Sequence, residues 1–126
     1  TFSGFLCSKQ VVENMIQQGS GTILFTGATS SVRGAAGSIG FASGKFGMRG
    51  MAQSMARELG PKGIHVAHII IDGQINSPRV REMMPDREAH TFLDPDAIAD
   101  NYWHLANQDT TTWTLELDLR PNVEEF

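Results

Sequence analysis

The sequence predicts an α/β fold with a parallel β-sheet, because two kinds of segment alternate along it. Two short apolar runs, TILFT at 22–26 and IHVAHIII at 64–71, show little alternation of apolar and polar residues. Strands of this kind are typically buried on both faces, as in parallel sheets. Segments with helical spacing precede and separate the two runs. Strand, helix and strand therefore follow one another in the order that favours parallel pairing, with right-handed crossovers.

The first helix is predicted at 5–18, where apolar side chains recur at positions 5, 6, 11, 12, 15 and 16. The glycines at 19 and 21 provide a stop. Cys7 lies within the apolar pattern of this helix, so it is expected in the core.

The second helix is predicted at 41–59, after a loop at 27–40 that is rich in Gly, Ala and Ser. Gly60-Pro61 ends it. Its glycines at 44, 47 and 50 each cost about 1 kcal/mol of helix propensity relative to alanine, which indicates close packing at these positions. One stripe of the helix is expected to pack against the core, and it consists of Met48, Met51, Met55 and Leu59.

Three more elements follow the second apolar run. Pro78 can open a short helix to about 84, and Asp94-Pro95 begins another at 95–107. The last strand is predicted at 113–120, where leucines at 115, 117 and 119 alternate onto one side. The order is thus helix, strand, helix, strand, short helices and strand.

Composition excludes several classes of function. The 126 residues carry 10 Lys and Arg against 14 Asp and Glu, so the net charge of −4 gives no field for nucleic acid or an anionic membrane. The basic cluster at 79–87 contains two acids and is expected to be a solvated helix face. No apolar run approaches the roughly 18 residues of a membrane span. One cysteine favours a reducing compartment, and we expect a cytoplasmic location.

The histidines do not indicate a metal centre. His65 and His68 lie three apart on a predicted strand, hence on opposite faces. No cysteine or carboxylate stands at a spacing that completes a ligand set, so no metal is expected.

Six motifs occur in order along nearly the whole chain. They are GFL at 4–6, GTILFTGATSS at 21–31, FASGK at 41–45, ARELGPKGIHV at 56–66, DGQINSP at 72–78 and ELDL at 116–119. Together they resemble the C-terminal half of the short-chain dehydrogenase/reductase family, NAD(P)-dependent oxidoreductases with a Rossmann-type, doubly wound parallel sheet. The resemblance implies that residues 1–126 are part of a single Rossmann-type domain, with three strands side by side. It also implies that the half with the phosphate loop is absent, so that TILFT presents an unpaired apolar edge.

The stretch TGATSSVRG at 26–34 looks like a phosphate loop, but its spacing argues against that role. The family loop reads T-G-x-x-x-G-x-G, and its later glycines let the backbone approach the pyrophosphate. Counted from Gly27, those glycines fall at Ser31 and Arg33. The stretch instead resembles the strand end that carries the family's active-site serine.

The resemblance places the catalytic positions on this stretch and on FASGK. The family motif Y-x-x-x-K falls on Phe41 and Lys45, so the general acid/base tyrosine is lost and the lysine that binds the nicotinamide ribose is kept. The family serine lies thirteen residues before that tyrosine, which is Ala28 here. The family asparagine falls at Thr1. Catalysis by the usual route is expected to be severely impaired. Hydroxyls near Ala28 remain as substitutes for the serine, on Thr29, Ser30 and Ser31.

The cofactor contacts implied by the resemblance follow the second strand. The family motif P-G-x-[IV]-x-T matches Gly73, Ile75 and Ser77 but has Asp72 in place of proline. NAD or NADP is the implied cofactor, although an anion at Asp72 is unfavourable near cofactor phosphates.

The resemblance also implies partners and leaves two functions open. In the family, the helices predicted at 5–18 and 41–59 form a four-helix interface, so a homodimer or homotetramer is expected. The first hypothesis is an NAD(P)-dependent oxidoreductase that acts on a small carbonyl or alcohol substrate. The second is a family member without catalysis that serves as a binding or dimerising subunit.

Overall fold

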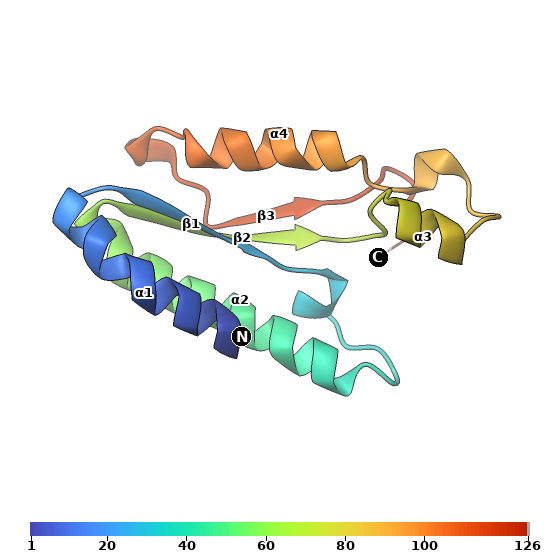
Figure 1. Ribbon diagram of the computed structural model, residues 1–126, viewed down its shortest axis with the longest axis horizontal. Helices are drawn as coiled ribbons and strands as arrows, with labels where there is room; N and C mark the ends of the chain where they lie inside the picture. The colour runs from blue at the N-terminus through green and yellow to red at the C-terminus, as the bar shows by residue number, and fades with distance from the viewer. Residues whose placement is uncertain (126) are drawn as a thin grey trace.

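A computed structural model describes residues 1–125 (Figure 1). Its sheet has three parallel strands, β1 (Gly21–Thr26), β2 (Ile64–Ile71) and β3 (Glu116–Leu119), in the order β1-β2-β3. Thr26 pairs with Ile69, and His68 pairs with Glu116. The predicted α/β class and the side-by-side placement of the three strands are confirmed. Within the described chain, β1 has a strand neighbour on one side only, as predicted.

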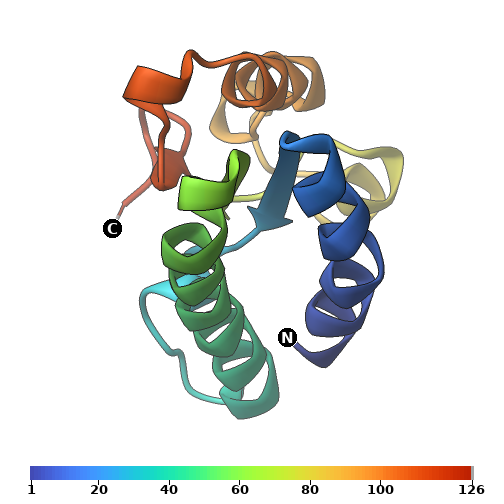
Figure 2. The ribbon, with the colours of Figure 1, turned by 90° about the vertical axis from the view of Figure 1, so that its left-hand side faces the viewer.

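Helices cover both faces of the sheet. The helices α1 (Phe2–Gln18) and α2 (Ile39–Leu59) lie on one face and α4 (Pro95–Ala106) on the other (Figures 1 and 2). Every residue of β2 is buried. The core on the α1/α2 side contains Phe25, Ala52, Leu59, Ile64 and Val66, with the predicted methionine stripe packed against it. The core on the α4 side contains Ile69, Ile71, Leu93 and Leu105.

The two crossover connections have opposite hands. The strand order is sequential, yet α2 and α4 lie on opposite faces, so the crossovers turn in opposite senses (Figures 1 and 2). The β1–α2–β2 connection is right-handed and the β2–α4–β3 connection is left-handed, so the prediction is wrong for the second. The right-handed rule reflects a strand that feeds directly into its helix. The second connection first passes through α3 (Pro78–Met83) and a turn at Ala89–Thr91, which lets α4 cover the opposite face.

Local signals set the helix ends close to the predicted positions. Gly19 adopts a left-handed conformation (φ 68°) and ends α1. The Ser77 hydroxyl accepts the Val80 N–H at the start of α3, and the Asp94 carboxylate accepts the Asp96 N–H at the start of α4. The last strand is shorter than predicted, because Trp113 stacks on His65 at 4.9 Å between ring centroids instead of continuing the ladder.

Two predictions on the helices are corrected. Cys7 is exposed rather than in the core, because α1 faces the core with Gly4, Val12 and Met15. Of the glycines at 44, 47 and 50, only Gly47 has a described residue of another segment, Thr1, within 4 Å of the point where a Cβ would stand. A Cβ on the glycines at 44 and 50 would meet nothing within 4 Å among the described residues.

The basic cluster at 79–87 is not wholly solvated. The Cζ atoms of Arg81 and Arg87 lie 4.8 and 5.2 Å from the ring centroid of buried Phe92. Arg87 also donates through Nε to the Thr91 hydroxyl at 2.9 Å. The prediction of a solvated helix face is therefore wrong for these two arginines. Both guanidinium groups pack on an aromatic ring, an interaction that counting charged residues does not reveal. Across residues 1–125, no helix is long and apolar enough to span a membrane.

Candidate active site

The structure brings Phe41 and Lys45 together at the carboxyl end of β1. They lie one turn apart on α2, with Lys45 Nζ 5.7 Å from the Phe41 ring centroid. Lys45 Nζ donates to the backbone carbonyl of Thr26 at 2.7 Å. Burial lowers the pKa of Lys45 from its ordinary value. Loops that follow the carboxyl ends of parallel strands are where α/β folds bind ligands.

A small cavity of about 210 Å³ lies beside this pair. Thr1, at the family's asparagine position, lines it together with Phe41 and Lys45. The Thr1 hydroxyl donates to the Gly44 carbonyl at 2.5 Å. Three of the four catalytic positions implied by the resemblance therefore line the same cavity. Ala28 does not line it.

Ala28 begins a turn that commits two of the three neighbouring hydroxyls. Its backbone N–H donates to Ser31 Oγ at 3.1 Å, and Ser31 is fully buried. The Thr29 hydroxyl donates to Asp72 Oδ1 at 2.5 Å. Ser30 is half-buried and its hydroxyl makes no hydrogen bond to any residue of 1–125. Among the three hydroxyls left open by the sequence, only that of Ser30 remains uncommitted.

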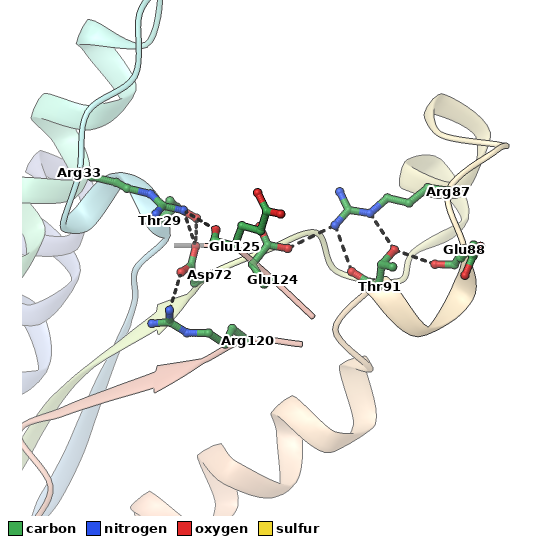
Figure 3. Close-up of polar contacts among 9 residues, drawn as sticks. All are labelled: Thr29, Arg33, Asp72, Arg87, Glu88, Thr91, Arg120, Glu124 and Glu125. Carbon is green, nitrogen blue, oxygen red and sulfur yellow. Dashed lines mark hydrogen bonds and ion pairs between the residues drawn. The ribbon is translucent and has the colours of Figure 1, made fainter. Parts of the chain in front are cut away.

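Asp72 is held by partners from two other strand ends (Figure 3). It is buried, and its carboxylate lies 3.6 Å from Arg33 Nη2 and 3.5 Å from Arg120 Nη1. Arg33 also donates to the backbone carbonyl of Glu125 at 3.3 Å. Two guanidinium groups thus compensate the anion that replaces the family's proline. Sequence reasoning missed both arginines, although a buried acid after a strand is itself a signal that cations lie nearby.

The three predicted cofactor positions lie after β2 in distinct environments. Gly73 has φ 140°, and a Cβ there would lie 3.1 Å from Leu93 Cδ1 and 3.2 Å from Pro121 Cδ, so glycine is required. Ile75 forms a parallel bridge with Leu93 and is partly exposed. Ser77 Oγ caps α3 at 3.4 Å from the Val80 nitrogen. All three positions lie in the segment that follows the carboxyl end of β2, directly after Asp72.

Thr26 is also contacted from the opposite face of the sheet, by Tyr102. The hydroxyl of Tyr102, on α4, shares a 2.8 Å hydrogen bond with the Thr26 hydroxyl. Burial raises the pKa of Tyr102, so the phenol keeps its proton at neutral pH. The side chains of Thr26 and Tyr102 also line a cavity of about 600 Å³, whose other walls are mainly apolar residues of α4 and the sheet.

A partly buried chain of polar side chains that the sequence did not indicate lies on the α2 side of β2 and β3. Arg49 forms a bidentate pair with Glu116 at 2.7 Å, and Glu116 Oε2 lies 3.1 Å from His68 Nδ1. His65, on the other face as predicted, places its ring nitrogens 3.1 and 2.8 Å from backbone carbonyls at 105 and 114. No group of three or more His, Cys, Asp and Glu side chains that could hold a metal ion occurs among the described residues.

The parallel sheet, with polar loops gathered at its carboxyl edge, defines a fold of the Rossmann type. The sequence profile of the short chain dehydrogenase family matches residues 1–88. The chain belongs to this family.

Individual relatives agree with this assignment. A short-chain dehydrogenase from Rhodopseudomonas palustris is 43% identical, with a TM-score of 0.75 over 96% of this chain and 48% of that one. Sorbitol-6-phosphate 2-dehydrogenase of Escherichia coli strain K12 is 28% identical over 99 residues, 78% of this chain and 38% of the relative. A serine dehydrogenase complexed with NADP⁺ shares the fold at 15% identity, with a TM-score of 0.80 over 94% of this chain and 51% of that one. The chain thus spans about half the length of these structures or less.

We expect Asp72→Ala to lower the free energy of unfolding by roughly 2–3 kcal/mol, because two arginines lose a buried anion. The matched change Arg33→Ala should cost under about 1 kcal/mol, since Arg33 is largely exposed and Arg120 still faces Asp72. Urea unfolding of both variants measures the difference. Equal losses would contradict a central role for the carboxylate.

Proposed function

We propose that the protein carrying this chain is an NAD(P)-dependent oxidoreductase of a small carbonyl or alcohol substrate, with its usual acid/base chemistry impaired. The observation that carries this proposal is the position of Lys45, whose ammonium group lies at the carboxyl end of β1. By resemblance, this ammonium group contacts the nicotinamide ribose. The relatives named above are dehydrogenases, and one of them holds NADP⁺.

The cofactor fits the described residues in two respects. Gly73, Ile75 and Ser77 follow β2 at the spacing of the family motif. Asp72 does not oppose an anionic cofactor as the sequence suggested, because Arg33 and Arg120 compensate its charge. When bound, NAD(P) would supply the hydride. Lys45 would orient the ribose, and the backbone from Gly73 to Ser77 would position the nicotinamide end.

Catalysis is impaired in this proposal because the usual proton donors are missing. The Phe41 ring carries no exchangeable proton, and loss of a general acid costs about 10²–10⁴ in rate. Ala28 has no hydroxyl, and loss of an oxyanion-type donor costs about 10²–10³. Ser30 lies two positions after Ala28 and carries a hydroxyl without a hydrogen bond to residues 1–125. It is our candidate for a substitute hydrogen-bond donor.

The alternative is a member without catalysis that serves as a binding or dimerising subunit. Large apolar side chains are exposed on α1 and α2, which favours an interface on this face, and they include Phe5, Leu6, Val11, Ile39, Phe41 and Phe46. We propose that these helices make a homodimer or homotetramer under either function. The single cysteine favours a cytoplasmic location for the protein.

Lys45→Ala should weaken NADH or NADPH binding about tenfold or more in the full-length protein, because a charge-assisted hydrogen bond is lost. Lys62→Ala, at an exposed lysine beyond the end of α2, is the matched control and should leave affinity unchanged. Fluorescence titration of reduced cofactor measures both. Wild-type protein that binds neither nucleotide would favour the inactive-subunit alternative.

Phe41→Tyr should raise turnover by about 10²-fold or more in a screen of carbonyl substrates, because it restores a proton donor one turn from Lys45. Phe46→Tyr adds the same hydroxyl elsewhere on α2 and should have no such effect. Rates come from NAD(P)H absorbance. Efficient wild-type turnover that survives Lys45→Ala would argue against the role of this lysine.

Phe5→Glu should weaken self-association at least tenfold, because it places a charge within the exposed apolar face of α1. Trp103→Glu changes an exposed aromatic on α4, on the opposite face of the sheet, and is the control. Light scattering across a concentration series measures the oligomeric state. An unchanged assembly in Phe5→Glu, or equal dissociation of both variants, would place the interface elsewhere.

A further inference from the structure

The residues that follow β3 pack on the segment that follows β2 (Figure 3). We call residues 120–125 the strap. A 3.0 Å hydrogen bond from the Glu124 N–H to the Pro121 carbonyl closes its turn. The strap lies so close to Gly73 that a Cβ there would stand 3.2 Å from Pro121 Cδ and 3.5 Å from Glu124 Oε2. It is therefore packed against the end of β2 and does not extend freely from the sheet.

One side of the strap contacts the loop after β1. Arg33, in this loop, donates from Nη2 to the Glu125 carbonyl at 3.3 Å. The same guanidinium nitrogen lies 3.6 Å from the Asp72 carboxylate. Arg120, the first residue of the strap, lies 3.5 Å from that carboxylate. The strap is thus connected through charged groups to the segment that carries Ser30.

The other side of the strap contacts Arg87. Glu124 Oε2 accepts a 3.3 Å hydrogen bond from Arg87 Nη2, and the two side chains are 23% and 31% exposed. Arg87 is held in this position by its own neighbours, because its Nε donates to the Thr91 hydroxyl and its guanidinium group packs on the Phe92 ring. A preorganised guanidinium group loses little conformational freedom when it binds a carboxylate. Glu124 therefore pairs with a cation whose position is already fixed.

Residues 77–92 form an excursion from the sheet that contains α3. At the base of this excursion, the Leu93 N–H donates to the Gln74 carbonyl at 2.8 Å. Beyond the base, the pair of Arg87 and Glu124 is the single hydrogen bond or ion pair that joins residues 77–92 to any other part of residues 1–125. The strap therefore supplies the one polar contact that fixes this excursion from outside.

We propose that the strap holds residues 77–92 in place through the pair of Glu124 and Arg87, and thereby positions this segment relative to the loop after β1. Glu124 is then a positioning residue that acts through Arg87, and it does not line the cavity beside Lys45. The strap itself does not depend on the proposed dehydrogenase function. An effect on cofactor binding does depend on it, because Ser77, at the start of the segment, is a cofactor position only by resemblance.

The size of the expected effect follows from the exposure of the pair. Both side chains are partly exposed, and ion pairs of this kind change a local equilibrium by a few fold rather than by orders of magnitude. No strap residue belongs to either hydrophobic cluster of the core. Loss of the pair should therefore free residues 77–92 locally and leave the sheet intact.

Hydrogen–deuterium exchange of the full-length protein, followed by mass spectrometry at constant pH, tests the strap. We expect Glu124→Ala to lower the protection of a peptide spanning residues 77–92 about threefold. Glu125→Ala removes the neighbouring carboxylate, which has no ion pair among the described residues, and should leave this protection unchanged. A peptide spanning residues 64–71 of β2 should keep its wild-type protection in both variants.

A double-mutant cycle shows whether Glu124 acts through Arg87. In the background of Arg87→Ala, the further change Glu124→Ala should not lower the protection of residues 77–92 again. Should Arg87→Ala not fold, the neutral Arg87→Gln takes its place. The proposal is overturned if Glu124→Ala leaves the protection of residues 77–92 at the wild-type level, or if the effects of the two changes add in full.

Titration of NADH or NADPH measures the consequence for the candidate site. Affinity should fall about threefold in Glu124→Ala and stay unchanged in Glu125→Ala. Reduced protection of residues 77–92 without a change in affinity would overturn the positioning role. A wild-type protein that binds neither nucleotide would count against the proposed function, and the exchange experiment would still decide whether the strap holds this segment.

Discussion

The complete burial of β2 is the constraint on which the rest of the structure depends. A strand covered on both faces needs a neighbour on each edge and a layer on each side, because unpaired backbone groups and exposed isoleucines are both costly. Parallel pairing with β1 and β3 meets the first need, and α2 and α4 meet the second. The left-handed second crossover follows from this requirement. Its helix has to reach the face of β2 that Ile69 and Ile71 make apolar.

The same strand orders the chemistry at its carboxyl end. Asp72 and Gly73 come directly after it, with Arg33 from the loop after β1 and Arg120 from the end of β3 placed around the carboxylate (Figure 3). The ion pairs of Asp72 therefore link the segments that follow β1, β2 and β3, which are far apart in the sequence. A proline at this position would give rigidity through its ring, whereas this chain holds the segment through the electrostatic contacts of Asp72.

The sequence predicts the fold well where a pattern depends on one segment alone. The apolar runs at 22–26 and 64–71, the methionine stripe of α2 and the capping residues Ser77 and Asp94 each carry their signal locally. Phe41 and Lys45 share a helix face at a spacing that any helix produces, and the structure places them together. Whether these residues and Ala28, Gly73, Ile75 and Ser77 act in binding or catalysis stays a prediction.

The features that the sequence did not predict depend on distant partners. The hand of the second crossover depends on which face of the sheet remains uncovered. The exposure of Cys7 depends on which side of α1 meets α2. Arg33 pairs with Asp72 across 39 positions, and Arg49 with Glu116 across 67, so no local pattern relates either pair.

Thr26 joins the two helical layers through one residue at the end of β1. Its carbonyl oxygen receives the ammonium group of Lys45 from α2, and its hydroxyl shares a hydrogen bond with Tyr102 from α4. The two helices lie on opposite sides of the sheet and have no other such connection through this strand end among the described residues. One strand residue thus anchors both Lys45 of α2 and Tyr102 of α4, so the position of the lysine and that of the opposite helix are referred to the same backbone.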